Sequence, residues 1–214
     1  MPRQHQPELL DSLPPHHPDA VHSRRDLRII NRILGSHRWF ARTLPSLLGA
    51  GETVLELGAG TGELARHLIA RGLAVDGLDL WPTPVPLPAG RRWHRADLRA
   101  FDAFASYPVV IGNLIFHQLT DAELAALGRA LQAGTRVIVA CEPARRKISR
   151  RLFRRLGPLF GANPVTLHDG CVSIDAGFQR DELPRLLGLD PRTWDVHCTT
   201  TALGACRMVA LRRS

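Results

Sequence analysis

A chain of 214 residues is long enough to form one domain that buries roughly 70 to 75% of its unfolded surface. Its formal net charge of +8 comes almost entirely from arginine, with Lys147 the only lysine, so we give the charge about half weight as evidence for a nucleic-acid partner. The four cysteines contain no CxxC pair and are too sparse for a disulfide scaffold, which favours a reduced, cytoplasmic protein. No run resembles a signal peptide or reaches the roughly 18 to 20 apolar residues that span a bilayer.

Residues 1–22 are rich in proline, histidine and acidic residues, and we predict that they form a flexible tail. Residues 23–214 are predicted to form a single domain. Its first segment is helical, Gly35 interrupts the pattern, and a second helix is expected over residues 36–48. Two helices thus precede the first strand, and the apolar face of the first is predicted to contain Leu27, Ile30 and either Ile33 or Leu34.

Short apolar runs then alternate with helical segments, which is the pattern of parallel strands joined by crossover helices. Thr120 and Glu123 form a capping-box pattern where the helix after the fourth strand begins. The last two apolar runs meet at a short turn and predict an antiparallel hairpin. The expected fold is α/β, a doubly wound sheet of seven strands, mostly parallel, with strands in residues 53–57, 74–80, 92–98, 108–115, 135–141, 193–203 and 204–213.

The segment VLELGAGTGEL, residues 54–64, places three glycines in the loop after the first strand. In a doubly wound sheet this loop lies in the ligand crevice beyond the carboxyl ends of the strands. A dinucleotide fingerprint requires a third glycine three residues after Gly60, where Glu63 stands. Because a glutamate at a helix entrance repels a pyrophosphate, the loop favours an adenosine ligand without phosphates.

Acidic residues at successive strand ends agree with such a ligand. Glu56 ends the first strand, Asp79 ends the second and Asp97 follows the third. Each of them alone could be a helix cap or a solvated loop acid, but parallel strands bring all three to one edge of the sheet. Carboxylates there suit hydroxyls, amines and a cation, and they suit phosphates badly.

The segments VLELGAGTGEL, VDGLDL and RADL resemble the glycine motif, the second motif and the adenine region of the class I S-adenosylmethionine-dependent methyltransferases. The resemblance covers residues 23–214 and implies a Rossmann-like fold, S-adenosyl-L-methionine as cofactor and S-adenosyl-L-homocysteine as product. It implies that Glu56 lies near the cofactor's amino end, that Asp79 holds the ribose hydroxyls and that Leu80 or Trp81 lies beside the adenine. The implied cofactor-binding residues are Glu56, Gly58, Ala59, Gly60, Gly62, Asp79, Leu80, Asp97, Leu98 and Asn113.

A second resemblance is confined to NRILGSHRWFAR, residues 31–42. This segment is similar to the N-terminal helical segment of the ubiquinone and menaquinone biosynthesis methyltransferases, with Asn31, His37, Arg38 and Trp39 as counterparts. It implies that His37 and Trp39 bind the substrate, a small aromatic or quinone-like acceptor. The segment GNLIFHQL, residues 112–119, departs from that family's loop.

Methyl transfer depends mainly on alignment, because orientation supplies roughly 7 to 11 kcal/mol whereas a general base adds about 3 to 5 kcal/mol. His117, just past the fourth strand, is the first candidate for the base, and the alternative is a histidine packed near a helix start. His168 with Asp169 is the second, since a carboxylate raises the basicity of an imidazole, and the alternative is a surface turn. No His/Cys/Asp cluster has the spacing of a metal site, so no metal is predicted.

The run ARRKISRRLFRRLGPLF, residues 144–160, predicts a basic amphipathic helix, with one apolar stripe and one stripe of arginines. We weigh three roles: peripheral contact with a membrane that holds a lipophilic acceptor, contact with RNA, and a lid over the acceptor pocket, which we prefer.

The sequence thus predicts an enzyme that O- or C-methylates a small aromatic or quinone-like molecule. The alternatives are an RNA methyltransferase, which the charge favours, and a non-catalytic sensor or scaffold that binds the cofactor. The oligomeric state is not predicted.

Overall fold

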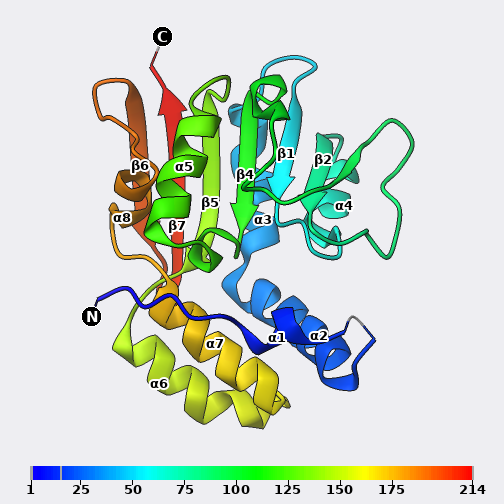
Figure 1. Cartoon of the computed structure of the whole chain (residues 1–214), viewed down its shortest axis with the longest axis vertical. Coiled ribbons are helices and arrows are strands. Elements are labelled where there is room, and N and C mark those ends of the chain that lie inside the picture. The colour runs from blue at the N-terminus through cyan, green and yellow to red at the C-terminus, as the bar shows by residue number, and fades with distance from the viewer. Residues whose placement is uncertain (1, 15, 214) are drawn as a thin grey trace.

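A seven-stranded sheet forms the centre of the protein in the computed structural model, which describes residues 2–14 and 16–213 (Figure 1). The strand order is β3-β2-β1-β4-β5-β7-β6. Neighbours among the first five are parallel, and β7 runs antiparallel between β5 and β6, which confirms the predicted fold and its closing hairpin. The strands are β1 Thr53–Leu57, β2 Ala74–Asp79, β3 Trp93–Arg95, β4 Val109–Asn113, β5 Val137–Pro143, β6 Trp194–Thr200 and β7 Ala205–Arg212.

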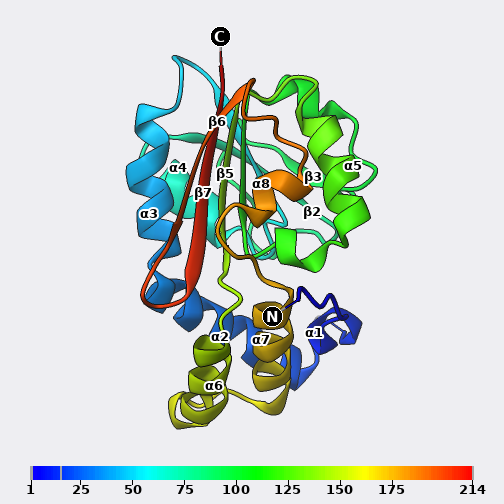
Figure 2. The ribbon, with the colours of Figure 1, turned by 90° about the vertical axis from the view of Figure 1, so that its left-hand side faces the viewer.

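Helices cover both faces of the sheet (Figure 2). Helices α3 (Ser36–Thr43) and α4 (Glu63–Ile69) lie on one face, and α5 (Asp121–Leu131) and α8 (Glu182–Leu186) lie on the other. Successive strand residues enter opposite cores because side chains alternate along a strand: Val54 packs with the first pair of helices and Leu55 with the second. Short 3-10 helices are η1 Leu44–Ser46, η2 Ala103–Ser106, η3 Phe116–Gln118 and η4 Gly157–Phe160.

A separate layer of helices lies beyond the carboxyl ends of the parallel strands (Figures 1 and 2). It consists of α1 (Leu9–Ser12), α2 (Pro18–Leu34), α6 (Lys147–Leu156) and α7 (Pro164–Ala176). Helix α7 lies at its centre and contacts the other three. In the part of the chain that the structure describes, no helix has the length and apolar character needed to cross a membrane.

Local capping explains where these helices begin and end. The predicted capping box is confirmed, because Thr120 Oγ1 accepts the backbone N–H of Glu123 while the Glu123 carboxylate accepts that of Thr120. Gly35 has a φ of 65°, which ends α2 in the left-handed conformation that glycine adopts without strain. The following helix, α3, stops at Thr43 and continues as η1, so the predicted helix over residues 36–48 is shorter than expected.

Two further differences concern the N-terminal segment. Helix α2 begins at Pro18 and not at residue 23, because proline suits the first helical turn and the His17 side chain accepts the backbone N–H of Asp19. Its predicted apolar face is only partly confirmed: Leu34 packs against the core, but Leu27 and Ile33 are exposed, and the buried residues are Ala20, Ser23 and Asp26. A polar contact replaces the expected apolar one.

That polar contact joins α2 to α7. The Thr166 hydroxyl donates to Asp26 Oδ2 at 2.7 Å, and its oxygen lies 3.1 Å from Ser23 Oγ. Near the start of the chain, the Arg3 guanidinium donates to the carbonyl oxygens of His117 and Leu119. The division of the chain into a tail of residues 1–22 and a single domain stays a prediction.

Candidate cofactor and acceptor site

The strand register aligns three predicted residues at the carboxyl edge of the sheet. Leu57 of β1 pairs with Leu78 of β2 and with Gly112 of β4. The residues that follow them, Gly58, Asp79 and Asn113, therefore lie level on three neighbouring strands.

The three glycines of the loop have different neighbours. All have φ between 56° and 72°, a region in which other residues are strained. A Cβ atom on Gly58 would lie 2.4 Å from Ile115 Cδ1, and one on Gly62 would lie 3.3 Å from the Trp93 ring. A Cβ atom on Gly60 would meet nothing within 4 Å. Packing thus requires Gly58 to be small and leaves little room at Gly62, whereas Gly60 faces open space that a ligand can enter.

Asp79 fixes the shape of this loop. Its Oδ2 accepts the backbone N–H of Gly60 at 2.7 Å, and its Oδ1 accepts that of Trp81 at 2.9 Å. Burial raises the pKa of the Asp79 carboxyl above its ordinary value. The adjacent Leu80 and Trp81 side chains are each 55% exposed, so two apolar surfaces lie open beside the carboxylate.

Glu56 is a buried carboxyl with an unused oxygen. Its side chain is 3% exposed and its Oε2 has no hydrogen-bond partner among the described residues. Burial raises the pKa of Glu56 to about 8, and the nearby Asp79 charge adds to this effect. A buried carboxyl in this state is complementary to a cationic amine, which supplies the missing donors and restores the ionised form.

Asn113, at the end of the neighbouring strand, also has a buried oxygen that lacks a hydrogen-bond donor. Its amide nitrogen donates to Asn31 Oδ1 at 3.0 Å, but its own Oδ1 is buried without a donor in the described part of the chain. Asn31 belongs to α2, so the helical layer reaches the carboxyl edge at this point. Two unpaired acceptors on adjacent strands fit the amino end of the expected cofactor.

Asp97 and Leu98 follow β3, as predicted, but Asp97 already has partners. Its carboxylate accepts from the Arg99 backbone at 2.9 Å and from the Arg99 guanidinium at 2.6 Å, and these bonds lower its pKa. Arg99 also pairs with Glu123 at 3.0 Å, which ties this loop to α5. Leu98 packs against the core and is half-buried. Their place at the adenine edge stays a prediction.

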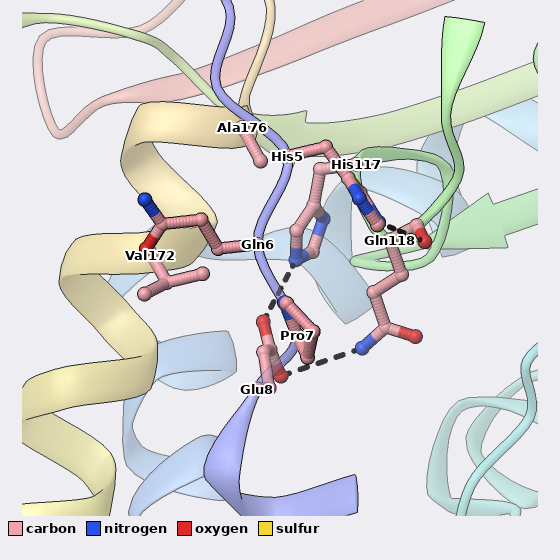
Figure 3. Close-up of a pocket in the computed structure, with 8 residues that line it drawn as sticks. All are labelled: His5, Gln6, Pro7, Glu8, His117, Gln118, Val172 and Ala176. Atoms are coloured by element: carbon pink, nitrogen blue, oxygen red, sulfur yellow. Dashed lines mark hydrogen bonds and ion pairs between the residues drawn. The ribbon is translucent and has the colours of Figure 1, made fainter.

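His117 is buried between two carboxylates, of which Figure 3 shows that of Glu8. Its Nδ1 lies 2.7 Å from Glu142 Oε2, and its Nε2 lies 3.3 Å from Glu8 Oε1. Burial alone favours the neutral ring, but the hydrogen bonds to Glu142 and Glu8 outweigh it and raise the pKa of His117 to about 9. This arrangement favours the imidazolium form of His117, which donates from both ring nitrogens.

Glu142 holds the segment around His117 in place. Its carboxylate accepts the backbone N–H groups of Ile115, Phe116 and His117 at 2.9, 3.1 and 3.2 Å. It directly follows the apolar run of β5, so the strand-end rule that identified Glu56 would have found it too. Glu8 was missed because it falls in the predicted tail.

A cavity of about 180 Å³ adjoins His117 (Figure 3). Three segments far apart in the sequence enclose it: the N-terminal segment, η3 and α7. Glu8 lines the cavity, and its Oε1 both contacts His117 and accepts a hydrogen bond from Ser173 of α7. The lining residues are His5, Gln6, Pro7, Glu8, His117, Gln118, Val172 and Ala176.

His168 and Asp169 lie on a helix, α7, and not on a surface turn. His168 Nδ1 is 2.9 Å from Asp169 Oδ1, as the predicted pair requires. The Asp169 carboxylate also accepts the backbone N–H groups of Leu9 and Leu10 at 2.8 and 2.9 Å, so it anchors the start of α1. The pair does not line the cavity beside His117, and its catalytic role stays a prediction.

His37 and Trp39 lie on α3, on the face of the sheet that α3 and α4 cover. The His37 ring is 5.6 Å from the ring of His67, and burial lowers the pKa of His37 to about 4. The Trp39 ring lies under the guanidinium of Arg207 at 5.1 Å. Neither residue lines the cavity, and substrate binding by them stays a prediction. No group of three or more potential metal ligands occurs within residues 2–14 and 16–213.

The relatives of the chain are methyltransferases. The demethylmenaquinone methyltransferase of Tropheryma whipplei is 26% identical over 166 residues, which cover 68% of this chain and 69% of that protein. An uncharacterized methyltransferase of Geobacillus thermodenitrificans is 31% identical over 102 residues, 42% of this chain and 47% of that protein. No protein-family profile matches the chain.

Methyltransferases also occur among the solved structures with a similar fold. The plantazolicin methyltransferase BpumL, in complex with S-adenosylhomocysteine, superposes with a TM-score of 0.73 at 13% identity and covers 96% of this chain and 93% of its own. The magnesium protoporphyrin IX methyltransferase of Synechocystis PCC 6803 gives a TM-score of 0.55 at 17% identity and covers 85% and 83%. The chain thus shares its fold with S-adenosylmethionine-dependent methyltransferases, and its glycine loop and its named relatives agree with this class.

Proposed function

We propose that the protein transfers a methyl group from S-adenosyl-L-methionine to a small aromatic or quinone-like acceptor, by O- or C-methylation. The observation that carries the cofactor assignment is the buried Glu56 Oε2, which has no partner in the described part of the chain, together with the open space at Gly60 of the following loop. The relatives support a small acceptor, since their names refer to demethylmenaquinone, plantazolicin and magnesium protoporphyrin IX. They give no support to the RNA or sensor alternatives.

In this proposal, different residues at the carboxyl edge bind different parts of the cofactor. Glu56 and Asn113 bind the amino group of the methionine part, because both have acceptors without donors. Asp79 binds the ribose hydroxyls, and Leu80 with Trp81 provides the exposed apolar surface for the adenine. Asp97 and Leu98 lie at the adenine edge, and Gly58, Ala59 and Gly62 keep the loop close enough for these contacts.

Bound S-adenosylmethionine supplies an electrophilic methyl group, so the protein has to hold the acceptor in line with it. We place the acceptor in the cavity beside His117, where it displaces Glu8 from the Nε2 atom. His117 then orients the acceptor by donating a hydrogen bond from its charged ring. This role replaces the expected general base at neutral pH, because Glu142 keeps its contact with Nδ1 and still favours the charged ring.

Transfer of label from isotopically labelled S-adenosylmethionine tests the proposed reaction. Two pools are offered to the full chain, a small-molecule extract rich in phenols and quinols, and total RNA. We expect label in the small molecules, and mass spectrometry then identifies the acceptor. Label in RNA alone would contradict the proposed acceptor, and label in neither pool would favour a binding protein without transfer.

Binding of S-adenosylhomocysteine tests the site independently of the acceptor. Asp79→Ala is expected to weaken binding at least tenfold, because it removes the ribose contact and the acceptor for Gly60 N–H. Asp190→Ala is the matched control, since Asp190 is also a loop carboxylate but contacts only its own turn and Arg192. Equal affinity in the two variants would remove Asp79 from the site.

A further inference from the structure

Helix α6 and η4 present an apolar stripe that nothing in the described chain covers. The stripe consists of Ile148, Leu152, Leu156, Leu159 and Phe160, all exposed, with Leu159 and Phe160 at 78% and 66%. Helix α6 attaches to the protein by its other side, where the Phe153 ring lies directly on Gly170 of α7 and Arg150 pairs with Asp175 at 2.7 Å. The stripe therefore faces outward, which disfavours the expected lid.

A second stripe on the outward side of α6 is positively charged. Residues 144–161 contain no aspartate or glutamate. Five of their cations are exposed and form no ion pair within the described part of the chain: Arg146, Lys147, Arg151, Arg154 and Arg155. Helical spacing sets Arg151 and Arg155 next to Ile148 and Leu152, so the cations border the apolar stripe along its length.

We propose that α6 and η4 bind the surface of an anionic lipid bilayer. A helix with adjoining apolar and basic stripes lies in the plane of the interface, with its apolar side chains below the headgroups and its cations among them. RNA would satisfy the cations but would leave Leu159 and Phe160 exposed to water. A second copy of the chain would bring two sets of five cations face to face.

The position of α6 in the fold determines which side of the protein would face the bilayer. Helix α6 packs on α7, and Val172 and Ala176 of α7 line the cavity beside His117. The bilayer would thus lie one helix away from that cavity, on the side of the carboxyl ends of the strands (Figure 2). The inference depends on the exposed stripes alone and not on the identity of the acceptor.

Sedimentation of the full chain with vesicles tests the surface. Vesicles of equal parts phosphatidylglycerol and phosphatidylcholine are compared with vesicles of phosphatidylcholine alone, at low and at high salt. We expect binding to the anionic vesicles only, and a loss of binding as salt screens the headgroups. Equal binding to both vesicles, or binding to neither at low salt, would overturn the proposal.

Two exposed double variants separate charge from burial of the apolar stripe. Arg151→Gln/Arg155→Gln is expected to lower the partition coefficient about tenfold or more, and Leu159→Ser/Phe160→Ser is expected to do the same without a change of charge. The controls are Arg129→Gln/Arg192→Gln, with the same loss of charge elsewhere on the surface, and Val85→Ser, which removes an exposed apolar residue from another loop. Both controls should bind like the unaltered protein.

A gel-shift assay with total RNA and a sedimentation measurement of mass complete the test. RNA binding without vesicle binding would overturn the proposal in favour of RNA. A dimer that Leu159→Ser/Phe160→Ser dissociates, again without vesicle binding, would identify the stripe as a contact between copies. A loss of vesicle binding in all four variants alike would also overturn it, because the effect would then not belong to α6 and η4.

Discussion

Two buried carboxyl groups at the same edge of the sheet have opposite surroundings. Glu142, at the end of β5, accepts three backbone N–H groups and contacts the His117 ring. Glu56, in β1, is almost as deeply buried, but one of its oxygens has no partner in the described chain and its pKa is raised to about 8. Groups of the protein itself thus satisfy the hydrogen-bonding capacity of Glu142, whereas one oxygen of Glu56 has no partner within the described residues.

We expect such a difference between a structural carboxylate and a carboxyl that binds a ligand. A buried polar group without a partner destabilises the fold, so its presence beside an open glycine loop indicates that a ligand supplies the missing partner. A fully hydrogen-bonded carboxylate stabilises the fold and has little capacity left for a ligand. Substitutions at the two positions should therefore change stability in opposite directions.

Glu142→Ala should have the largest effect. It leaves His117 Nδ1 and three backbone donors buried without an acceptor, and we expect the free energy of unfolding to fall by about 3 to 5 kcal/mol at neutral pH. Urea unfolding measures the loss. Asp195→Ala is the control, since Asp195 is exposed and only 3.8 Å from Arg213, and it should change stability little. A similar small loss in both variants would contradict the structural role of Glu142.

Glu56→Gln should stabilise the ligand-free protein in a pH-dependent way. The folded state holds the Glu56 proton up to about pH 8 and the unfolded state only up to about 4.5, so the free energy of unfolding falls as pH rises between these values. Between about pH 5 and pH 8, the fall in the free energy of unfolding from this cause is on the order of 3 kcal/mol. The glutamine variant lacks this pH-dependent fall, so its free energy of unfolding should rise relative to that of the unaltered protein as pH increases across this range.

The same variant should lose affinity for S-adenosylhomocysteine, because the amide cannot pair with the ligand's charged amine. Urea unfolding at both ends of the pH range and calorimetric binding provide the two measurements. If Glu56→Gln were less stable than the unaltered protein at about pH 8, the carboxyl would have a structural partner after all. If it kept full affinity, the amine would bind elsewhere.

Gly60→Ala tests the open space beside Glu56, with Gly72→Ala as its matched control. Both glycines have positive φ and nothing within 4 Å of an added Cβ atom. Both variants should therefore lose a similar amount of stability, about 1 to 2 kcal/mol, from backbone strain. Only Gly60→Ala should weaken S-adenosylhomocysteine binding, by about tenfold or more, and equal affinities would show that Gly60 does not face the ligand.

The sequence predicts the sheet well because its signals are local. Apolar runs, the capping box at Thr120 and the glycine at residue 35 each mark an element within a few residues, and the structure confirms them. The face of α2 could not be predicted this way. Its buried Asp26 is satisfied by Thr166, which is 140 residues further along the chain, and no local pattern reveals such a contact.

The candidate site shows the same contrast between local signals and long-range contacts. The positions of Glu56, Gly60 and Asp79 follow from strand ends and parallel topology, which the sequence supplies. The surroundings of His117 do not, because Glu8 lies 109 residues away in the sequence and Glu142 lies 25 residues away on another strand. The sequence could therefore identify the histidine but not its protonation state.

Glu8→Gln should have the smallest effect, confined to that protonation state. Removing one of the two carboxylates that face the ring should lower the pKa of His117 from about 9, because only Glu142 then stabilises the charged form. The paired ring stabilises the fold below about pH 6.5, and this stabilisation is lost as pH rises to about 9, so the variant should lose it at a lower pH. An NMR titration of the ring measures the shift, with Asp190→Gln as the control.

The pH dependence of methyl transfer then decides what His117 does. If the ring orients the acceptor as a donor, activity in Glu8→Gln should decline with rising pH earlier than in the unaltered protein, in step with the lower pKa. If the ring were a general base, activity should instead begin to rise at a lower pH, because the neutral form appears sooner. A pKa of His117 that did not move at all would mean that Glu8 does not face the ring in solution.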